Sequence, residues 1–284
     1  MMADIKLITD STSDLTHDLL KKHDIDVVPL YVNFSGESFF DGVNLTTEEM
    51  YNFIDKKKEL PKTAAASPGM FEETFKPYLE EGKDIIYLGI GSKFSASLQS
   101  ATTAKKILES DKVHVIDSEN LSSGSGLLLL KAARFIEDGD PVEVIVEKIK
   151  ALIPNVRSQF VIKTLEYLYK GGRLNALSHL MGTMLKIKPI IKVRDGVMVV
   201  GKKSRGSLRK GIDLMLREFF RHRDDIDKEF VTITHSLNQE DAAYITEKLK
   251  EQGVDIEHIY ETKAGCVISS HCGRGTIGIL YMMK

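Results

Sequence analysis

Residues 84–110 read DIIYLGIGSKFSASLQSATTAKKILES and hold, in succession, a strand, a glycine- and serine-rich loop and a helix. Residues 84–90 are largely apolar and partly β-branched, which is typical of a short buried strand. Residues 97–110 have the apolar spacing of a helix. Because a strand that leads through a short loop into a helix is the repeating unit of α/β proteins, this stretch predicts that fold class.

The same unit recurs through the first half of the chain. Further strands are predicted at residues 6–9, 26–32 and 113–117, and helices at residues 14–23, 46–58, 68–81, 122–137 and 141–153. Pro154-Asn155 then interrupts the pattern, and we place a domain boundary there. The sequence thus predicts an N-terminal α/β/α domain, residues 1–154, with helices on both faces of a parallel sheet.

The second half, residues 155–284, is predicted to be an α/β domain with a mixed sheet. Asp195-Gly196 stands between two β-branched runs and is a strong hairpin signal. Other strands are predicted at residues 159–162, 188–193, 230–234, 255–260 and 276–282, and helices at residues 207–222 and 239–252. The hairpin implies antiparallel pairing within this domain.

Bulk composition excludes several classes of protein. The chain has 284 residues and a net charge of −2, which argues against a nucleic-acid partner. Two cysteines, Cys266 and Cys272, argue against a disulfide framework and favour a reducing cytoplasm. The N-terminus lacks the pattern of a signal peptide, and the longest apolar run, residues 127–130, is too short to span a bilayer.

Several stretches resemble known chemical motifs but lack a required residue or the required structural context. Residues 196–203 nearly spell a phosphate-binding P-loop, but they end in Lys203, and their central valines suit a strand. Residues 273–278 fit G-x-G-x-x-G, but no helix and second strand follow them. Cys266, His271 and Cys272 lack a fourth metal ligand. No G-x-S-x-G motif is present, so we expect no metal, no cofactor and no α/β-hydrolase chemistry.

Four segments rich in hydroxyls and glycine remain: residues 9–14, 63–69, 89–100 and 269–278. Each follows or caps an apolar run, where α/β proteins commonly bind anions. The hydroxyls of Ser95 and Ser97, with the free N–H groups of the helix behind them, make a candidate anion site. Simple N-capping explains the same residues equally well.

Three more residues are candidates for contact with an anion. The imidazole of His271 could donate a hydrogen bond to a carboxylate or phosphate, although a lone histidine is more often structural. Arg173 and Arg205 each stand beside glycine and could clamp an oxyanion or meet an acidic partner. The alternative for both is a solvated surface charge.

Taken together, these segments resemble the DegV family, the fatty-acid-binding subunits of bacterial fatty acid kinase. The matching pieces cover essentially the whole chain. They are, in order, ITDSTSDL, YVNFSGESFFDGVNLTTEEMY, TAAASPGMF, GIGSKFSASLQSA, VIDSENLSSGSGLLL, TLEYLYKGGRLNALSHLMGTMLKIKPIIKVRDG and VISSHCGRGTIGI. Their order and spacing, more than any one piece, make the resemblance specific.

The resemblance implies a DegV-like fold of two α/β domains with one fatty acid buried between and within them. By this likeness Thr63 and Ser95 hydrogen-bond the carboxylate, His271 reaches it from the C-terminal domain, and Arg205 lies nearby. Ser97 and Cys272 complete the expected ligand-binding set. Arg173 is expected on the face that meets the kinase subunit.

This sequence departs from the family pattern at three places. Ala64, Ala65 and Ala66 stand where hydroxyl or amide side chains are usual, Ala96 replaces a glycine, and Arg274 replaces a proline. The alanines are expected to alter head-group hydrogen bonding, and Arg274 to add positive charge near the head group. The expected lining of the acyl tail, which plain core packing explains as well, is Leu165, Leu168, Leu180, Met181, Met184, Leu185 and Ile187.

The chain contains no recognisable ATP site, so the resemblance implies a non-catalytic carrier. A separate kinase subunit would convert the bound long-chain fatty acid to an acyl phosphate, and an acyltransferase would consume it. Peripheral contact with a membrane fits this role. An acyl-ester hydrolase and a sensor of another small anion are the alternatives. The preferred acyl chain and the oligomeric state are not predicted.

Overall fold

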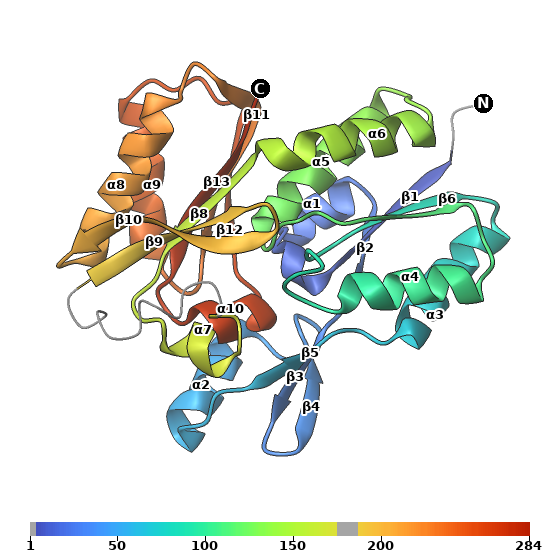
Figure 1. Ribbon diagram of the computed structural model, residues 1–284, viewed down its shortest axis with the longest axis horizontal. Helices are drawn as coiled ribbons and strands as arrows, with labels where there is room; N and C mark the ends of the chain where they lie inside the picture. Colours follow the sequence, from blue (N-terminus) through green and yellow to red (C-terminus); the bar gives the residue numbers. More distant parts are fainter. Residues whose placement is uncertain (1–3, 175–186) are drawn as a thin grey trace.

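The computed structural model describes residues 4–174 and 187–284, whose strands form three sheets (Figure 1). The first is a parallel sheet with the order β2 (Ile25–Val28), β1 (Ile5–Asp10), β6 (Asp84–Leu88) and β7 (Val113–Ile116). Its strands are short and apolar, as expected for a sheet that is covered on both faces. The predicted parallel sheet of the first half is therefore confirmed.

Helices cover both faces of this parallel sheet. On one face lie α3 (Pro68–Glu80) and α4 (Ser97–Ile107), which contribute Phe71, Phe75, Ala101 and Ala104 to a buried cluster. On the other face lie α1 (His17–Lys22), α5 (Ser123–Glu137) and α6 (Val142–Leu152). The side chain of Ser67 caps α3, directly before Pro68 at its first turn.

The second sheet contains six strands and is mixed. Its order is β10 (Val197–Arg205), β9 (Ile187–Arg194), β8 (Val156–Val161), β13 (Ile277–Met283), β11 (Ile226–His235) and β12 (His258–Lys263). Strands β9 and β10 form the predicted hairpin, with Asp195 and Gly196 at φ 50° and 71°. Residues 197–205 form a strand, which confirms that the P-loop-like sequence is not a phosphate loop.

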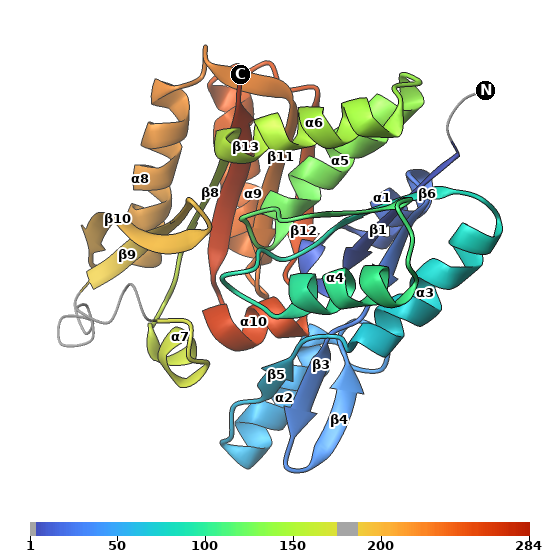
Figure 2. The same cartoon turned by 45° about the vertical axis from the view of Figure 1, so that its right-hand side comes forward.

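Helix α5 is shared between the two sheets. Its residues Leu127–Leu130 are fully buried and contact apolar side chains of both the parallel sheet and the mixed sheet. The opposite face of the mixed sheet is covered by α8 (Leu208–Arg221) and α9 (Gln239–Glu251) (Figure 2). The sheets divide near residue 155, but one core joins them, so the division into domains 1–154 and 155–284 stays a prediction.

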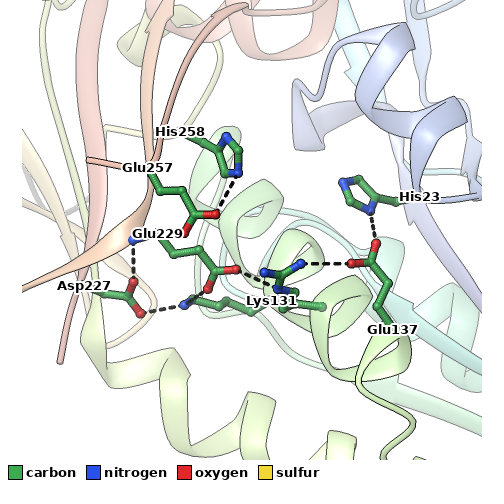
Figure 3. Close-up of polar contacts among 8 residues, drawn as sticks. His23, Lys131, Glu137, Asp227, Glu229, Glu257 and His258 are labelled. Atoms are coloured by element: carbon green, nitrogen blue, oxygen red, sulfur yellow. Dashed lines mark hydrogen bonds and ion pairs between the residues drawn. The ribbon is translucent and has the colours of Figure 1, made fainter. Parts of the chain in front are cut away.

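Ion pairs reinforce the contact between α5 and the mixed sheet (Figure 3). Lys131 on α5 lies 2.6 Å from Asp227 and 2.5 Å from Glu229, both on β11. At the far end of α5, Glu137 lies 3.1 Å from the His23 imidazole. Lys131 is nearly buried, which makes these pairs less screened than exposed ones.

The third sheet is small and antiparallel, and the sequence did not predict it. It has the order β4 (Glu37–Phe40), β3 (Tyr31–Phe34) and β5 (Lys62–Ala64), and α2 (Thr47–Lys57) packs beside it. The single strand predicted over residues 26–32 is wrong. Pro29 lacks an N–H and separates β2 from β3, which belong to different sheets. Thr63 accordingly lies on a strand instead of in a loop.

A short helix, α10 (Cys266–Cys272), lies between the halves of the molecule, beside α7 (Glu166–Lys170) and β5 (Figure 1). His271, which the sequence places in a segment rich in hydroxyls and glycine, occupies the last turn of this helix. In the described ranges, no helix combines the length and the apolar character needed to cross a bilayer.

Candidate functional site

A cavity of about 160 Å³ lies where the two halves of the molecule meet. The first half lines it from β5, through Thr63, and from the loop between β6 and α4, through Phe94 and Ser95. The second half contributes Arg173, just beyond α7, and His271 on α10. Three of the four hydroxyl-rich segments thus converge on one space, whereas no residue of segment 9–14 lines it.

Thr63 and His271 form the clearest polar pair in the cavity. Thr63 Oγ1 lies 2.8 Å from His271 Nε2, a good hydrogen-bond distance between residues from opposite halves of the chain. Burial, with a smaller effect of the Arg173 charge, lowers the pKa of His271 to about 4. The imidazole is therefore neutral at pH 7 and carries one proton.

The surroundings of His271 favour a proton on Nε2. Its Nδ1 is buried and has no hydrogen-bond partner among the described residues. A Cβ on Gly171 would collide with Nδ1, so glycine is needed for the imidazole to fit there. A buried N–H without an acceptor is costly, which favours the tautomer in which Nε2–H donates to Thr63. The Thr63 hydroxyl proton is then free to donate into the cavity.

Ser95 and Ser97 do not have equivalent positions. Ser95 is half-buried and lines the cavity, whereas Ser97 is fully buried and does not line it. The two hydroxyl oxygens are 3.0 Å apart, and the backbone N–H of Ser97 donates to Ser95 Oγ at 3.2 Å. Ser97 therefore supports Ser95, which is the hydroxyl that faces a ligand.

Arg173 contributes positive charge to the cavity wall. Its Nε and Nη2 donate to the carbonyl oxygen of Phe94 at 3.2 and 3.1 Å, and Nη1 donates to that of Gly171 at 2.9 Å. No carboxylate of the described residues forms a salt bridge with it. A guanidinium held by carbonyls keeps its net charge, so it can attract an anion. Arg173 is half-buried in this wall instead of projecting from an exposed face.

An open hollow of about 410 Å³ adjoins the polar side of the cavity. Phe94, Ser95 and Arg173 line both spaces, and Ser92 and Lys93 line the hollow alone. A group held at Ser95 would therefore face a route to solvent.

The opposite side of the cavity is apolar. Ile90, Phe160 and Leu168 line it, and a second compartment of about 40 Å³ lies beside Leu121, Phe160, Ile268 and Cys272. Burial raises the pKa of Cys272 to about 12, so its thiol stays protonated. Cys272 thus belongs to the apolar wall and not to the polar end, where the sequence had grouped it with His271.

Several predicted ligand residues lie elsewhere. Arg205 ends β10, is exposed and lines neither cavity. Arg274 is exposed and pairs with Asp55 at 3.0 Å, so it adds no charge to the polar end. Leu165 is buried core next to the cavity, and Ile187 does not line it. Leu180, Met181, Met184 and Leu185 lie outside the described residues.

Of the alanine departures, Ala64, Ala65 and Ala96 line the cavity and Ala66 is buried core. Small side chains at the polar end leave Thr63, Ser95 and His271 as its uncharged hydrogen-bonding side chains. Cys266 and Cys272 are free thiols. Over residues 4–174 and 187–284, no group of three or more His, Cys, Asp or Glu side chains is placed to hold a metal ion.

Comparison with known proteins identifies relatives over the full chain. A family model described as "Uncharacterised protein, DegV family" matches residues 4–284. A DegV domain-containing protein of Clostridium acetobutylicum is 37% identical over 284 residues, covering 100% of both chains.

Solved structures show the same fold. A DegV family protein from Thermus thermophilus, described as binding fatty acid, has a TM-score of 0.93 and 30% identity, covering 99% of this chain and 100% of its own. DegV from Bacillus subtilis, described as a fatty acid binding protein, has a TM-score of 0.89 and 28% identity, covering 99% and 100%. A stearic-acid-binding protein from Eubacterium ventriosum has a TM-score of 0.88 and 27% identity, covering 99% and 98%.

Proposed function

This chain belongs to the DegV family, and from that premise we propose that it is a carrier that binds one long-chain fatty acid in the cavity between its two halves. The observation that carries the proposal is one cavity whose lining is polar at one end and apolar at the other. The fatty-acid binding described for its structural relatives supports the same ligand class.

The polar end suits a carboxylate. A carboxylate can leave water only where donors and positive charge replace its hydration. The hydroxyls of Thr63 and Ser95 supply donors, and the Arg173 guanidinium supplies charge. In this arrangement His271 acts through Thr63, whose hydroxyl it orients, instead of contacting the carboxylate itself.

The apolar end suits a hydrocarbon chain. Each methylene group that leaves water for this space contributes about 0.8 kcal/mol. The wall beyond Phe160 and Leu168 offers almost no polar surface, so the tail and not the head group enters it. The compartment past Ile268 and Cys272 would receive the end of the chain.

We also propose that a separate kinase subunit phosphorylates the bound fatty acid. The open hollow beside Ser95 and Arg173 gives a second protein access to the carboxylate. Transfer of the γ-phosphoryl group of ATP, bound by the kinase subunit, to the carboxylate would yield an acyl phosphate and release ADP, and a downstream acyltransferase would consume the acyl phosphate. A kinase that docks over the hollow would contact Lys93 and Arg173, which keeps Arg173 as a candidate docking residue. We propose this role in the cytoplasm, with no cofactor on this chain.

The test is extraction of the purified protein, followed by mass spectrometry of the extract. The protein is washed, denatured and analysed for fatty acids, and a delipidated sample is then offered palmitate. About one fatty acid per chain, with a narrow range of lengths, supports the carrier. A protein that is empty and takes up no palmitate contradicts it. Release of acid from acyl esters would instead indicate the hydrolase alternative.

A further inference from the structure

The N-terminal segment of residues 9–14 lines no part of the cavity, yet two of its side chains are buried carboxylates. Asp10 and Asp14 are 0% and 7% exposed, and Asp41, which lies just after β4, is 3% exposed. Burial, with smaller effects of the charges of Asp41 and Asp10, raises the pKa of Asp14. Three acids kept in the interior at such a desolvation cost need an explanation.

Two of these carboxylates hold the first turn of α10. Asp41 accepts hydrogen bonds from the backbone N–H groups of Cys266 at 2.6 Å and Val267 at 3.2 Å. Asp14 accepts from the N–H of Gly265 at 2.8 Å. The N–H groups at a helix start lack partners within the helix, so these acceptors fix where α10 begins.

The fit between Asp41 and α10 is close. A Cβ on Gly265, the residue that precedes the helix, would lie 3.0 and 3.1 Å from the two carboxylate oxygens of Asp41. The opposite end of α10 carries His271, whose bond to Thr63 requires the helix to sit at one position. Placement of the first turn therefore sets the placement of the imidazole.

The third carboxylate, Asp10, holds the loop that carries Ser95 to the polar end of the cavity. Asp10 Oδ2 accepts from the N–H of Ile90 at 3.0 Å and from the Tyr87 hydroxyl at 2.8 Å. Ile90 begins the loop that carries Ser95, and a Cβ on Gly89 would collide with Asp10. Asp10 therefore ties the end of β1 to this loop.

We propose that Asp10, Asp14 and Asp41 are positioning residues for head-group recognition, holding the Ser95 loop and the His271 helix so that Thr63 and Ser95 converge on one carboxylate. The inference rests on the proposed fatty-acid binding and adds to it the residues that make the polar end selective. It also gives the segment ITDSTSDL a role in supporting the polar end of the cavity without contacting the ligand.

The test compares a carboxylate with a neutral head group on the same tail. Palmitate and 1-hexadecanol each displace a fluorescent fatty acid from the wild type and from Asp41→Asn. An Asn side chain keeps one acceptor but turns an N–H₂ group toward the second backbone N–H. The variant is expected to bind palmitate about tenfold more weakly, as for loss of one charge-assisted bond, and 1-hexadecanol less than about twofold more weakly.

Matched variants separate positioning from general stability. Ile245→Val, in the buried face of α9 and absent from the lining of both compartments, is expected to lower the melting temperature and leave the palmitate-to-hexadecanol ratio unchanged. Gly265→Ala keeps all three carboxylates but displaces α10, so it is expected to lower the ratio in the same direction as Asp41→Asn. It also provides the test if Asp41→Asn does not fold.

A spectroscopic readout follows His271 directly. In the wild type, the hydrogen-bonded Nε2–H of His271 should give a protected imidazole proton signal by NMR, and Gly265→Ala should weaken that protection. Variants that keep both the wild-type ratio and the protected signal overturn the positioning role while leaving fatty-acid binding intact. A wild type that binds neither palmitate nor hexadecanol overturns the proposed function itself.

Discussion

The two ends of the cavity are built in different ways. The polar end takes Thr63, Ser95, Arg173 and His271 from four segments that are far apart in the sequence, and each depends on a partner for its orientation. The apolar end consists of side chains such as Phe160 and Leu168 that belong to the hydrophobic core between the halves. We therefore expect changes at the apolar end to cost stability, and changes at the polar end to alter which head group binds.

The largest effect is expected for Phe160→Ala at the apolar end. Phe160 is 8% exposed, and its truncation leaves a hole in the core as well as a longer cavity. The free energy of unfolding should fall by about 3–5 kcal/mol, as measured by denaturant titration. A loss below about 1 kcal/mol would show that the apolar end is not part of the core, and it would contradict the proposed difference between the two ends of the cavity.

Thr63→Val tests the polar end of the cavity. The substitution keeps the shape of the side chain, removes the hydroxyl from the ligand and leaves His271 Nε2 without its partner. Palmitate affinity should fall about tenfold, and the melting temperature should fall as well, because the buried Nε2–H of His271 loses its acceptor. Displacement titration and thermal unfolding check both parts. Unchanged affinity would remove Thr63 from the head-group site.

The pH dependence of stability should report the neutral state of His271. Its folded-state pKa of about 4 lies below the ordinary histidine value of 6.5, so the unfolded chain binds the proton more readily between these values. The contribution of His271 is complete above pH 6.5 and is lost as pH falls toward 4, by at most about 1.4 kcal/mol per pH unit. In ligand-free protein, the difference in free energy of unfolding between the wild type and His271→Gln should follow this curve. A flat difference would mean that the imidazole is not buried as described.

The smallest effect is expected for Arg274→Ala. Arg274 is exposed, and its partner Asp55 is 59% exposed, so the pair should contribute less than about 1 kcal/mol. Palmitate affinity should stay within about twofold of the wild type because Arg274 lines neither cavity. A clear loss of affinity would place Arg274 at the polar end, as the sequence had suggested.

The parts that the sequence predicted well are those with strong local patterns. Residues 127–130 are four consecutive leucines, which make this part of the helix apolar all round. They form the fully buried centre of α5. Asp195-Gly196 has the residues that a tight hairpin requires, and the hairpin formed there. The fold class followed from such patterns, the family followed from the resemblance of whole segments, and both are confirmed.

The parts that the sequence missed are set by distant contacts. Nothing local shows that residues 62–64 pair with β3, because three residues carry too little periodicity. Residues 266–272 form a helix since carboxylates at positions 14 and 41 bind its first turn, a contact across more than 200 residues. The sequence made Arg173 a candidate for holding an oxyanion. No sequence pattern predicts its hydrogen bond to the Phe94 carbonyl oxygen, which places the guanidinium in the cavity wall.

The most direct test of the account is a crystal structure of the protein grown with palmitate. We predict one acyl chain in the cavity, with carboxylate oxygens within about 3.2 Å of Thr63 Oγ1 and Ser95 Oγ and the methyl end beside Ile268 and Cys272. A carboxylate at the Cys272 end, or palmitate bound anywhere outside this cavity, would contradict the assignment of the two ends.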